Sequence, residues 1–405
     1  MDSPHANQYK DYGYPILNLV VKKYVEPNLR DVALVACLDL RAPELKMLDL
    51  LRSSGLDPQQ CVIIGRKYSA HPFIQEILDL QGFVTAPFAL EFCANEPFES
   101  WYTKKVQGLV NGLNSHIDWS LKRKVILVDD GGFIHCAFAE NKKLRDCYSD
   151  DIFVGIERST FGATKIESGH IKACEHFLSA AQNEEYPGEA FYHAREAVNR
   201  IIAHIEQRRF KDPVILVDGL NPVGRQVAYE LFVRRGFRGV VTDHKYCISG
   251  TNPYIDPTCR LLSERRMIVD HQAVFSHLKQ YHVIVGASGF MTINPHQVGL
   301  LHPRASLINV SDCGDRQFWV QPFRNIGNAA HDDCYREGRC LVNAGHPIIA
   351  RGALHEMHPR YSELGVARLL SSILDLATAD HDDPFRPKRS EVMKDAHEMW
   401  RKQIE

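Results

Sequence analysis

Short apolar runs that alternate with helical stretches constrain the fold of this chain more than any other feature. The runs span residues 31–37, 61–65, 125–128, 214–217, 239–242, 282–285 and 306–310. Such short, nearly continuous apolar segments are typical of strands buried on both faces of a parallel sheet. Helical periodicity separates them over residues 42–53, 190–207, 224–235, 270–280 and 361–379. We therefore predict an α/β fold built on doubly wound parallel sheets.

The chain is long enough for more than one such sheet. Its 405 residues correspond to two or three domains of ordinary size. The polar, turn-forming stretch at 182–188 marks a change of character, so we predict domains over 1–190 and 191–342 and a C-terminal segment over 343–405. Residues 380–405 are highly charged, and we expect a surface helix there.

Charge and cysteine usage limit the compartment and the partners. Lys plus Arg total 48 and Asp plus Glu total 50, so the net charge of −2 offers no field for nucleic acid or an anionic membrane. No segment has the length or apolarity of a membrane helix or a signal peptide. Eleven scattered cysteines without C-x-x-C pairs indicate reduced thiols in a cytoplasmic protein. The loose spacing of His331, Cys334, Cys340 and His346 is not that of a zinc site, and we expect no metal.

A glycine turn follows the apolar run at 214–217. Gly219 and Gly224 fill the first and third positions of the dinucleotide fingerprint, and Asn221, which tolerates left-handed backbone geometry, takes the second. Asp243 closes the next strand 243 − 224 = 19 residues later, where a carboxylate accepts hydrogen bonds from a ribose. The turn predicts a bound NAD, held by Gly219, Asn221, Val223, Gly224 and Asp243. Any strand–helix turn favours glycine, however, and the neighbouring His244 and Lys245 leave NADP open.

Carboxylates and glycines also follow the run at 125–128. Asp129, Asp130, Gly131 and Gly132 come where the carboxyl end of a strand opens a ligand site in an α/β sheet. A helix cap is the alternative interpretation of Asp130.

Four segments in order resemble S-adenosyl-L-homocysteine hydrolase (adenosylhomocysteinase). Residues 128–132 are similar to the Asp-Asp-Gly-Gly turn of that family, and 155–162 to its Glu-Glu-Thr-Thr-Thr-Gly segment. Residues 192–196 with the Gly219 turn resemble its linker helix and cofactor turn, and 343–347 resembles its Gly-His-Pro loop.

The resemblance implies an N-terminal α/β substrate domain, to which the C-terminal segment returns, and a central Rossmann NAD-binding domain. It implies a cleft between them in which NAD oxidises the substrate and later returns the hydride, and a homo-oligomer. Matched by position, Asp130 and His346 are acid–base candidates. The matching cofactor contacts are Ser159, Thr160, Asn309 and Asn343.

The departures from the family pattern fall on the substrate side. Asp39 and Arg41 replace a histidine and a threonine, and Arg158 replaces a glutamate, although the adjacent Glu157 recovers it with a one-residue slip. Glu185 falls at the catalytic lysine and Glu189 at its paired aspartate. A carboxylate has the wrong charge to replace that lysine in alcohol oxidation, so we expect no competent hydrolysis of S-adenosylhomocysteine.

We therefore expect an NAD-binding enzyme repurposed to a different small molecule that is nucleoside-like, amino-acid-like or anionic. Its candidate catalytic residues are Asp130, Glu157, Glu189 and His346, and its candidate substrate-binding residues are Asp39, Arg41 and Arg158. Two alternatives remain open. One is a non-catalytic NAD- or nucleoside-binding protein that acts through a partner, and the other is a simple NAD-dependent dehydrogenase.

Overall fold

The fold is seen in a computed structural model that describes residues 12–24, 27–65, 72–86, 98–119, 122–147, 152–169, 176–180, 188–243, 257–288, 293, 295–310, 339–341, 347–349, 359–378 and 389–404. The chain forms two compact units. Unit 1 comprises 1–186 and 357–405, and unit 2 comprises 187–356. The boundaries predicted from the sequence fall after residues 190 and 342.

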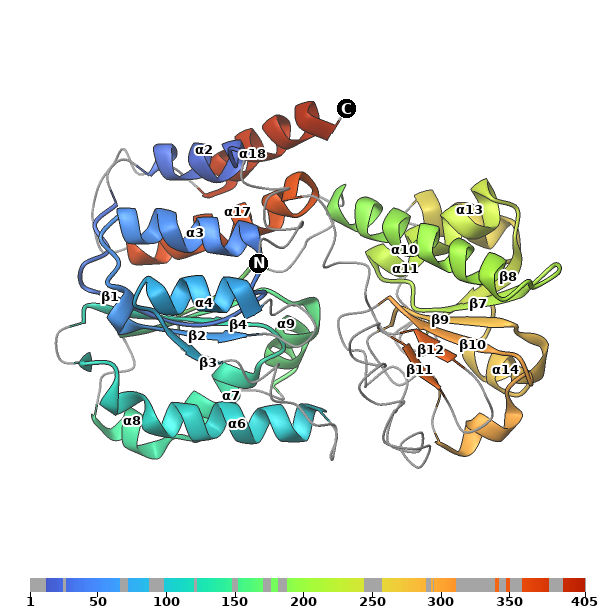
Figure 1. The fold of residues 1–405 in the computed structure, drawn as a ribbon, viewed down its shortest axis with the longest axis horizontal. Coiled ribbons are helices and arrows are strands. Elements are labelled where there is room, and N and C mark those ends of the chain that lie inside the picture. Colours follow the sequence, from blue (N-terminus) through green and yellow to red (C-terminus); the bar gives the residue numbers. More distant parts are fainter. Residues whose placement is uncertain are drawn as a thin grey trace. The chain divides into compact units, whose positions relative to one another are not determined.

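Unit 1 is built on a parallel sheet of six strands (Figure 1). The strands are β1 (Val32–Leu38), β2 (Cys61–Gly65), β3 (Val84–Ala86), β4 (Lys124–Asp129), β5 (Phe153–Glu157) and β6 (His176–Ser179). Their order is β3-β2-β1-β4-β5-β6, and every neighbouring pair is parallel. The order reverses between β1 and β4, which makes the carboxyl ends of these strands the topological switch point where open α/β sheets bind ligands.

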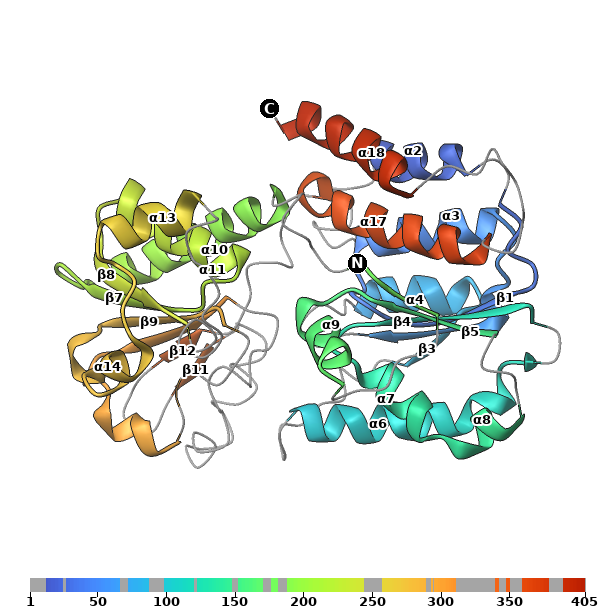
Figure 2. The same ribbon diagram turned by 180° about the vertical axis from the view of Figure 1, so that it is seen from behind.

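Helices cover both faces of this sheet, as Figures 1 and 2 show. On one face lie α3 (Ala42–Ser53) and α17 (Pro359–Ala377), with α2 (Pro15–Lys23) outside them; α6 (Phe98–Gly112) and α7 (Phe133–Glu140) cover the other. The remaining helices are α4 (Pro72–Leu80), α8 (Lys142–Cys147) and α9 (Thr160–Glu167), with short 3-10 turns at Pro58–Gln60 and Leu113–Ser115. Alternate strand residues enter the two cores: Ala33, Val35 and Cys37 pack toward α6 and α7.

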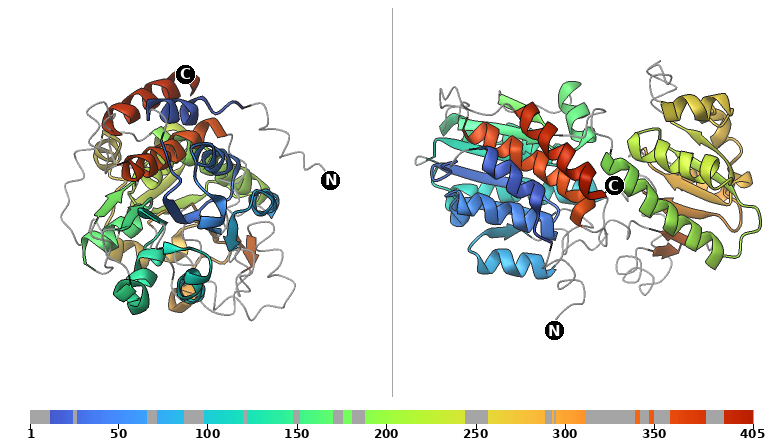
Figure 3. Two further views of the ribbon diagram at one scale, coloured as in Figure 1. Left: turned by 90° about the vertical axis from the view of Figure 1, so that its left-hand side faces the viewer. Right: turned by 90° about the horizontal axis from the view of Figure 1, so that it is seen from above.

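The C-terminal helix has a buried face. In α18 (Arg389–Ile404), Val392, Met393, Ala396 and Trp400 are buried, and the indole Nε1 of Trp400 donates a hydrogen bond to the Arg360 carbonyl over 2.7 Å. Figure 3 shows α18 and α2 side by side over α17. The predicted C-terminal helix is therefore present, but it is not only a charged surface helix. Its apolar residues pack in the outer layer of unit 1, against α17 and α2.

Unit 2 has a second sheet, in the order β11-β12-β10-β9-β7-β8. The strands are β7 (Val214–Asp218), β8 (Arg238–Thr242), β9 (Val283–Gly286), β10 (Ser306–Asn309), β11 (Arg339–Leu341) and β12 (Pro347–Ile349). All neighbours are parallel except β11 and β12. The covering helices are α10 (Gly188–Gln207), α11 (Pro222–Ala228) and α13 (Pro257–Glu264) on one face and α14 (His271–Phe275) on the other. A π-helical turn at Tyr229–Arg234 continues α11, and 3-10 turns span Leu278–Gln280 and Pro295–Leu300.

Both sheets confirm the predicted α/β class, with Rossmann-type doubly wound topology. The seven apolar runs all form strands. On the apolar face that the spacing predicts for α10, Ala194, Val198, Ile201 and Ile205 are buried and Ile202 is partly buried. In the part of the chain that the structure describes, no helix is long and apolar enough to cross a membrane.

Candidate functional site

The carboxyl ends of β1, β4 and β5 bring four of the predicted site residues together in unit 1. Asp39 and Arg41 follow β1, Asp130 follows β4, and Arg158 follows β5. Asp39 Oδ2 lies 2.7 Å from a terminal nitrogen of Arg41 and 3.2 Å from one of Arg158, and Arg158 Nε lies 3.5 Å from Asp130 Oδ2. The predicted substrate-binding residues therefore form one ion-pair network at the switch point.

Glu44 completes this network, which we call the charge cluster: Asp39, Arg41, Glu44, Asp130 and Arg158. Its Oε1 lies 3.2 Å from Arg41 and 3.8 Å from Arg158, and the side chain is 1% exposed. Burial raises the pKa of Glu44, and the neighbouring Arg41 opposes that rise. The two arginine side chains keep 16–17% of their surface exposed, so the cluster has access to solvent through its cations.

Asp129 holds the turn that leads into α7. Its Oδ2 accepts a hydrogen bond from the His135 amide over 2.8 Å. Its Oδ1 accepts from the Asp130 amide over 2.7 Å. The carboxylate of Asp130 faces Arg158, with Oδ2 3.5 Å from Arg158 Nε.

Glu157 supports the same turn from the next strand. Its Oε1 accepts hydrogen bonds from the Gly131 amide at 3.0 Å and from the amide and hydroxyl of Ser159 at 2.8 and 2.7 Å. Its Oε2 accepts from the Gly132 amide at 3.0 Å. These four bonds make Glu157 a residue that positions the Asp130 turn. They also use the hydroxyl of Ser159, which the sequence analysis assigned to the cofactor.

Burial shifts the pKa values of three side chains beneath the Asp130 turn. Burial, opposed by amide hydrogen bonds, raises the pKa of Asp129 to about 7, and burial with the nearby charge of Asp129 raises that of Glu157. Burial also lowers the pKa of His135 to about 4, so its imidazole is uncharged at neutral pH.

In unit 2 the glycine turn lies between β7 and α11, as predicted. Gly219 has φ +126°, and a Cβ there would lie 2.4 Å from the Ser288 amide nitrogen, so only glycine fits. A Cβ on Gly224 would lie 2.1 Å from the Gly219 carbonyl oxygen, which is the close helix packing that the third fingerprint glycine permits.

Asn221 departs from the expected left-handed geometry. Its backbone is extended, with φ −61° and ψ 168°, because it is the N-cap of α11. Its Oδ1 accepts from the Gly224 amide at 2.8 Å and its Nδ2 donates to the Ala287 carbonyl at 2.6 Å. The side chain therefore engages an amide that could otherwise face a phosphate.

The residues of this turn fit a dinucleotide in part. The Asp243 carboxylate reaches back over the turn, where Oδ2 accepts from the Leu220 amide at 2.6 Å, and a carboxylate keeps acceptor sites for ribose hydroxyls. The amides of Asn221 and Val223 take no part in the hydrogen bonds described above. The turn, its acid and its helix thus suit a dinucleotide, and Asn221 is the departure from the fingerprint.

The other predicted residues are less informative. Thr160 begins α9 in unit 1, Glu189 lies in the first turn of α10, and Asn309 ends β10 in unit 2. Asn343 and His346 lie outside the described residues, as do Glu185, His331 and Cys334.

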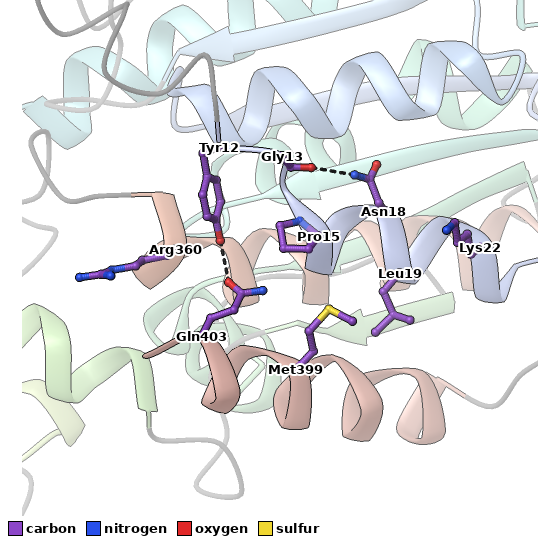
Figure 4. A pocket seen from close by; sticks show the side chains of 9 residues that line it. All are labelled: Tyr12, Gly13, Pro15, Asn18, Leu19, Lys22, Arg360, Met399 and Gln403. Carbon is purple, nitrogen blue, oxygen red and sulfur yellow. Dashed lines mark hydrogen bonds between the residues drawn. The ribbon is translucent and has the colours of Figure 1, made fainter. Parts of the chain in front are cut away.

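A cavity of about 790 Å³ lies elsewhere on unit 1, between α2 and α18. Figure 4 shows Pro15, Leu19 and Met399 at its apolar floor, with Lys22 and Arg360 at its sides. It contains none of the predicted site residues, and no nucleophile and base face each other there.

Comparison with known proteins gives relatives but no established family. No family model matches the chain. Two curated proteins, both uncharacterized, from Mycobacterium tuberculosis strains CDC 1551 / Oshkosh and ATCC 25618 / H37Rv, are each 23% identical over 332 residues, or 79% of this chain. The match covers 59% of their length, so the chain spans less than two thirds of these relatives.

Solved structures with similar folds include enzymes of several kinds. A dipicolinate synthase structure from Bacillus halodurans has 12% identity and a TM-score of 0.44, over 87% of this chain and 99% of that one. Dipicolinate synthase from Bacillus subtilis has 14% and 0.39 over 86% and 97%, and D-mandelate dehydrogenase from Rhodotorula graminis has 10% and 0.34 over 85% and 93%. At these sequence identities and TM-scores, the function of this chain has to be inferred from its own site.

Proposed function

We propose that the chain is an NAD-dependent enzyme with an adenosylhomocysteinase-like division of labour, in which unit 2 binds the cofactor and unit 1 binds a small-molecule substrate. The charge cluster at the switch point of unit 1 is the observation that carries the proposal. In this proposal the substrate is not S-adenosylhomocysteine, because Asp39 and Arg41 occupy the place of the family's uncharged or weakly basic groups.

The composition of the cluster favours an amino-acid-like substrate over a nucleoside-like or a simple anionic one. Two guanidinium groups and three carboxylates give a formal charge of 2 − 3 = −1, so an added anion meets net repulsion. When a zwitterion binds, one ion pair within the cluster is replaced by two ion pairs with the substrate. The substrate carboxylate pairs with a guanidinium group, and the substrate ammonium pairs with a carboxylate. The buried charges of the cluster then remain paired in the complex.

The residues of unit 1 have distinct parts in the proposed chemistry. NAD, when bound, accepts a hydride from the substrate and can return it. Asp130 is the candidate acid–base residue, because it is 6% exposed, lies in a turn whose amides donate hydrogen bonds to Asp129 and Glu157, and faces Arg158. In this proposal Arg158 pairs with Asp130 and orients the substrate carboxylate. Glu189 and His346 remain further candidates from the sequence.

A binding experiment with matched ligands tests the proposal. Thermal unfolding is followed with a panel of α-amino acids, with the corresponding carboxylic acids that lack the amino group, and with the corresponding amines, each with and without NAD. We expect one or more amino acids to raise the melting temperature by mass action, their single-charge analogues to raise it less, and NAD to strengthen the effect. Arg158→Gln should abolish the amino-acid shift, and Arg52→Gln, at an exposed ion pair far from the cluster, should retain it.

Other outcomes distinguish the alternatives. Release of homocysteine from S-adenosylhomocysteine at ordinary enzyme rates would contradict the proposal. NAD bound stoichiometrically after purification, released only by denaturation, supports a self-contained redox cycle. Free NADH that accumulates with substrate supports a simple dehydrogenase, and failure to bind any dinucleotide supports a non-catalytic binding protein.

The proposal includes a cytoplasmic, homo-oligomeric protein. Cys37, Cys61, Cys136 and Cys259, the cysteines among the described residues for which a state is assigned, are all free thiols, as a reducing compartment requires. Sedimentation of the purified protein measures the oligomeric state directly.

A further inference from the structure

Three buried side chains lie under the Asp130 turn, beside the charge cluster but outside it. Asp129 ends β4, His135 lies in the first turn of α7, and Glu157 ends β5. One ligand atom from each lies within 4.8 Å of the other two. Their exposed fractions are 0%, 1% and 0%, so the group is enclosed by protein.

His135 is the unusual member of this group. Both of its ring nitrogens are buried, and neither has a hydrogen-bond partner among the described residues. Unpaired polar atoms are rare in a protein interior because they lose their bonds to water without replacement. The Ile156 carbonyl is near enough to favour the protonated ring slightly, but it does not reach hydrogen-bond geometry. A backbone carbonyl in that position commonly orients a metal-binding imidazole.

The surrounding residues hold the imidazole in place. Phe177 meets the ring edge-on, with ring centroids 5.7 Å apart. The ring also lies against the backbone of β5 at Gly155, where a Cβ would lie 2.6 Å from the ring carbon Cε1. The strand therefore needs a glycine at this position for the ring to fit.

The two carboxylates of the group lack a neutralising cation within the described part of the chain. No ion pair there reaches Asp129 or Glu157, and their proximity is one cause of the raised pKa of Glu157. The amides of Asp130, Ile134 and His135 face the Asp129 carboxylate, and the Gly132 amide donates to Glu157 Oε2. Because a carboxylate oxygen offers two acceptor sites, Asp129 retains one of its four sites for a metal ion, and Glu157 Oε2 retains one of its two.

We propose that Asp129, His135 and Glu157 bind one Zn²⁺ ion through a carboxylate oxygen of Asp129, a ring nitrogen of His135 and Glu157 Oε2. Imidazole favours Zn²⁺ over Mg²⁺ and Ca²⁺, and two carboxylates balance its charge. Tetrahedral coordination at about 2.0–2.2 Å requires the three atoms to move closer together than 4.8 Å. The ion anchors the turn that presents Asp130. This inference stands independently of the proposed function.

Metal binding to the purified full-length chain tests the site. The protein is stripped with a chelator, dialysed, and titrated with Zn²⁺ by calorimetry and with Co²⁺ by visible absorption. We expect one equivalent to bind, with Co²⁺ bands of oxygen and nitrogen coordination and no thiolate charge-transfer band. His135→Gln, Asp129→Asn and Glu157→Gln should each weaken binding by 10-fold or more, and far-UV circular dichroism identifies any variant that fails to fold.

Matched controls separate this site from others in a chain rich in histidine and cysteine. His204→Gln changes another buried histidine, which is paired with Ser306 at 2.9 Å in unit 2, and should bind Zn²⁺ like the wild type. Cys334→Ser should also leave binding unchanged. The proposal is overturned if the stripped wild type takes up no stoichiometric ion, if folded His135→Gln binds as tightly as the wild type, or if Cys334→Ser removes the bound ion.

Discussion

At the scale of single residues, Arg158 is the side chain on which the candidate site depends most. It lies within ion-pair distance of Asp39, Glu44 and Asp130, so it compensates carboxylates from three different elements. The sequence analysis identified Arg158 only as a departure from a family pattern. The structure adds that Arg158 is paired with the carboxylates of the charge cluster.

Replacing Arg158 by methionine should therefore destabilise the protein. Removal of one partner from a buried ion pair costs about 3–5 kcal/mol, and the 16% exposure of this side chain places the expected loss toward the lower end. Arg52→Met is the matched control, since Arg52 pairs with Asp49 at 3.3 Å with 44% of its side chain exposed and should cost less than about 1 kcal/mol. Urea unfolding measures both values, and equal losses would contradict this account of the cluster.

Glu363 gives a prediction of pH dependence. It is buried in α17, where Oε1 accepts from the Ile16 and Leu17 amides at 2.8 and 3.0 Å and Oε2 from the Tyr12 hydroxyl at 2.5 Å. Burial nevertheless raises the pKa of Glu363. The folded state thus binds a proton that the unfolded state has released, so this carboxyl reduces stability as pH rises from about 4.5 through its raised pKa.

Glu363→Gln should remove that contribution. The difference in unfolding free energy between wild type and variant is measured in urea from pH 4.5 to 7.5, so that all other titrating groups cancel. We expect the difference to shift in favour of the variant as pH rises. A difference that is constant with pH would show that Glu363 has the same pKa in both states.

At the scale of elements, the β7–α11 turn shows why the match to the dinucleotide fingerprint is incomplete. Gly219 and Gly224 are required by backbone contacts within unit 2, whether or not a cofactor binds. Asn221 uses its side chain to cap α11, so it stabilises the helix at the expense of an amide donor for pyrophosphate.

Asn221→Gly should lower the stability of unit 2 and raise its affinity for NAD. Loss of the cap and of the bond to Ala287 costs about 1 kcal/mol. The freed Gly224 amide should add about 1 kcal/mol to NAD binding, or about a 5-fold lower Kd. Calorimetric titration with NAD measures the change, and Asn221→Ala is the control, because it loses the cap but keeps a Cβ near the phosphates. Tighter binding by the alanine variant and not by the glycine variant would contradict this role of Asn221.

The sequence predicted the strands with long apolar runs, and it missed several shorter strands and two buried residues near the site. Seven strands were evident because apolar residues buried on both faces must be continuous. Of the five described strands that were missed, β3, β11 and β12 have three residues each at or next to sheet edges, β6 has four, and β5 was missed although its five residues are buried. Asp130 was found because charged residues directly after an apolar strand fall at the ligand-binding edge, whereas Asp39, Arg41 and Arg158 were found only as departures from the family pattern. Glu44 was missed because it begins an ordinary helix, and His135 because its partners lie 6 and 22 residues away without a motif.

At the scale of the whole molecule, the chain consists of two units with separate hydrophobic cores. The core of unit 1 includes α17, whose Leu364, Leu370 and Leu374 are fully buried, so the C-terminal segment is part of the fold of the N-terminal unit. The cores of unit 2 form on the two faces of its own sheet. Because each unit has its own cooperative core, the expectation is two unfolding transitions rather than one.

Each core truncation and each ligand should then shift one of these two transitions and leave the other unchanged. Leu370→Ala in unit 1 and Leu231→Ala in unit 2 each remove a fully buried side chain and should cost about 2–5 kcal/mol in one transition. By mass action, NAD should raise the melting temperature only of the transition that Leu231→Ala destabilises. Zn²⁺ should raise the melting temperature only of the transition that Leu370→Ala destabilises. Differential scanning calorimetry of the wild type and both variants, with each ligand alone, measures all of these shifts. If NAD instead raised the transition sensitive to Leu370→Ala, the cofactor would bind unit 1, whose sheet also has Rossmann strand order, and the proposed roles of the two units would be reversed.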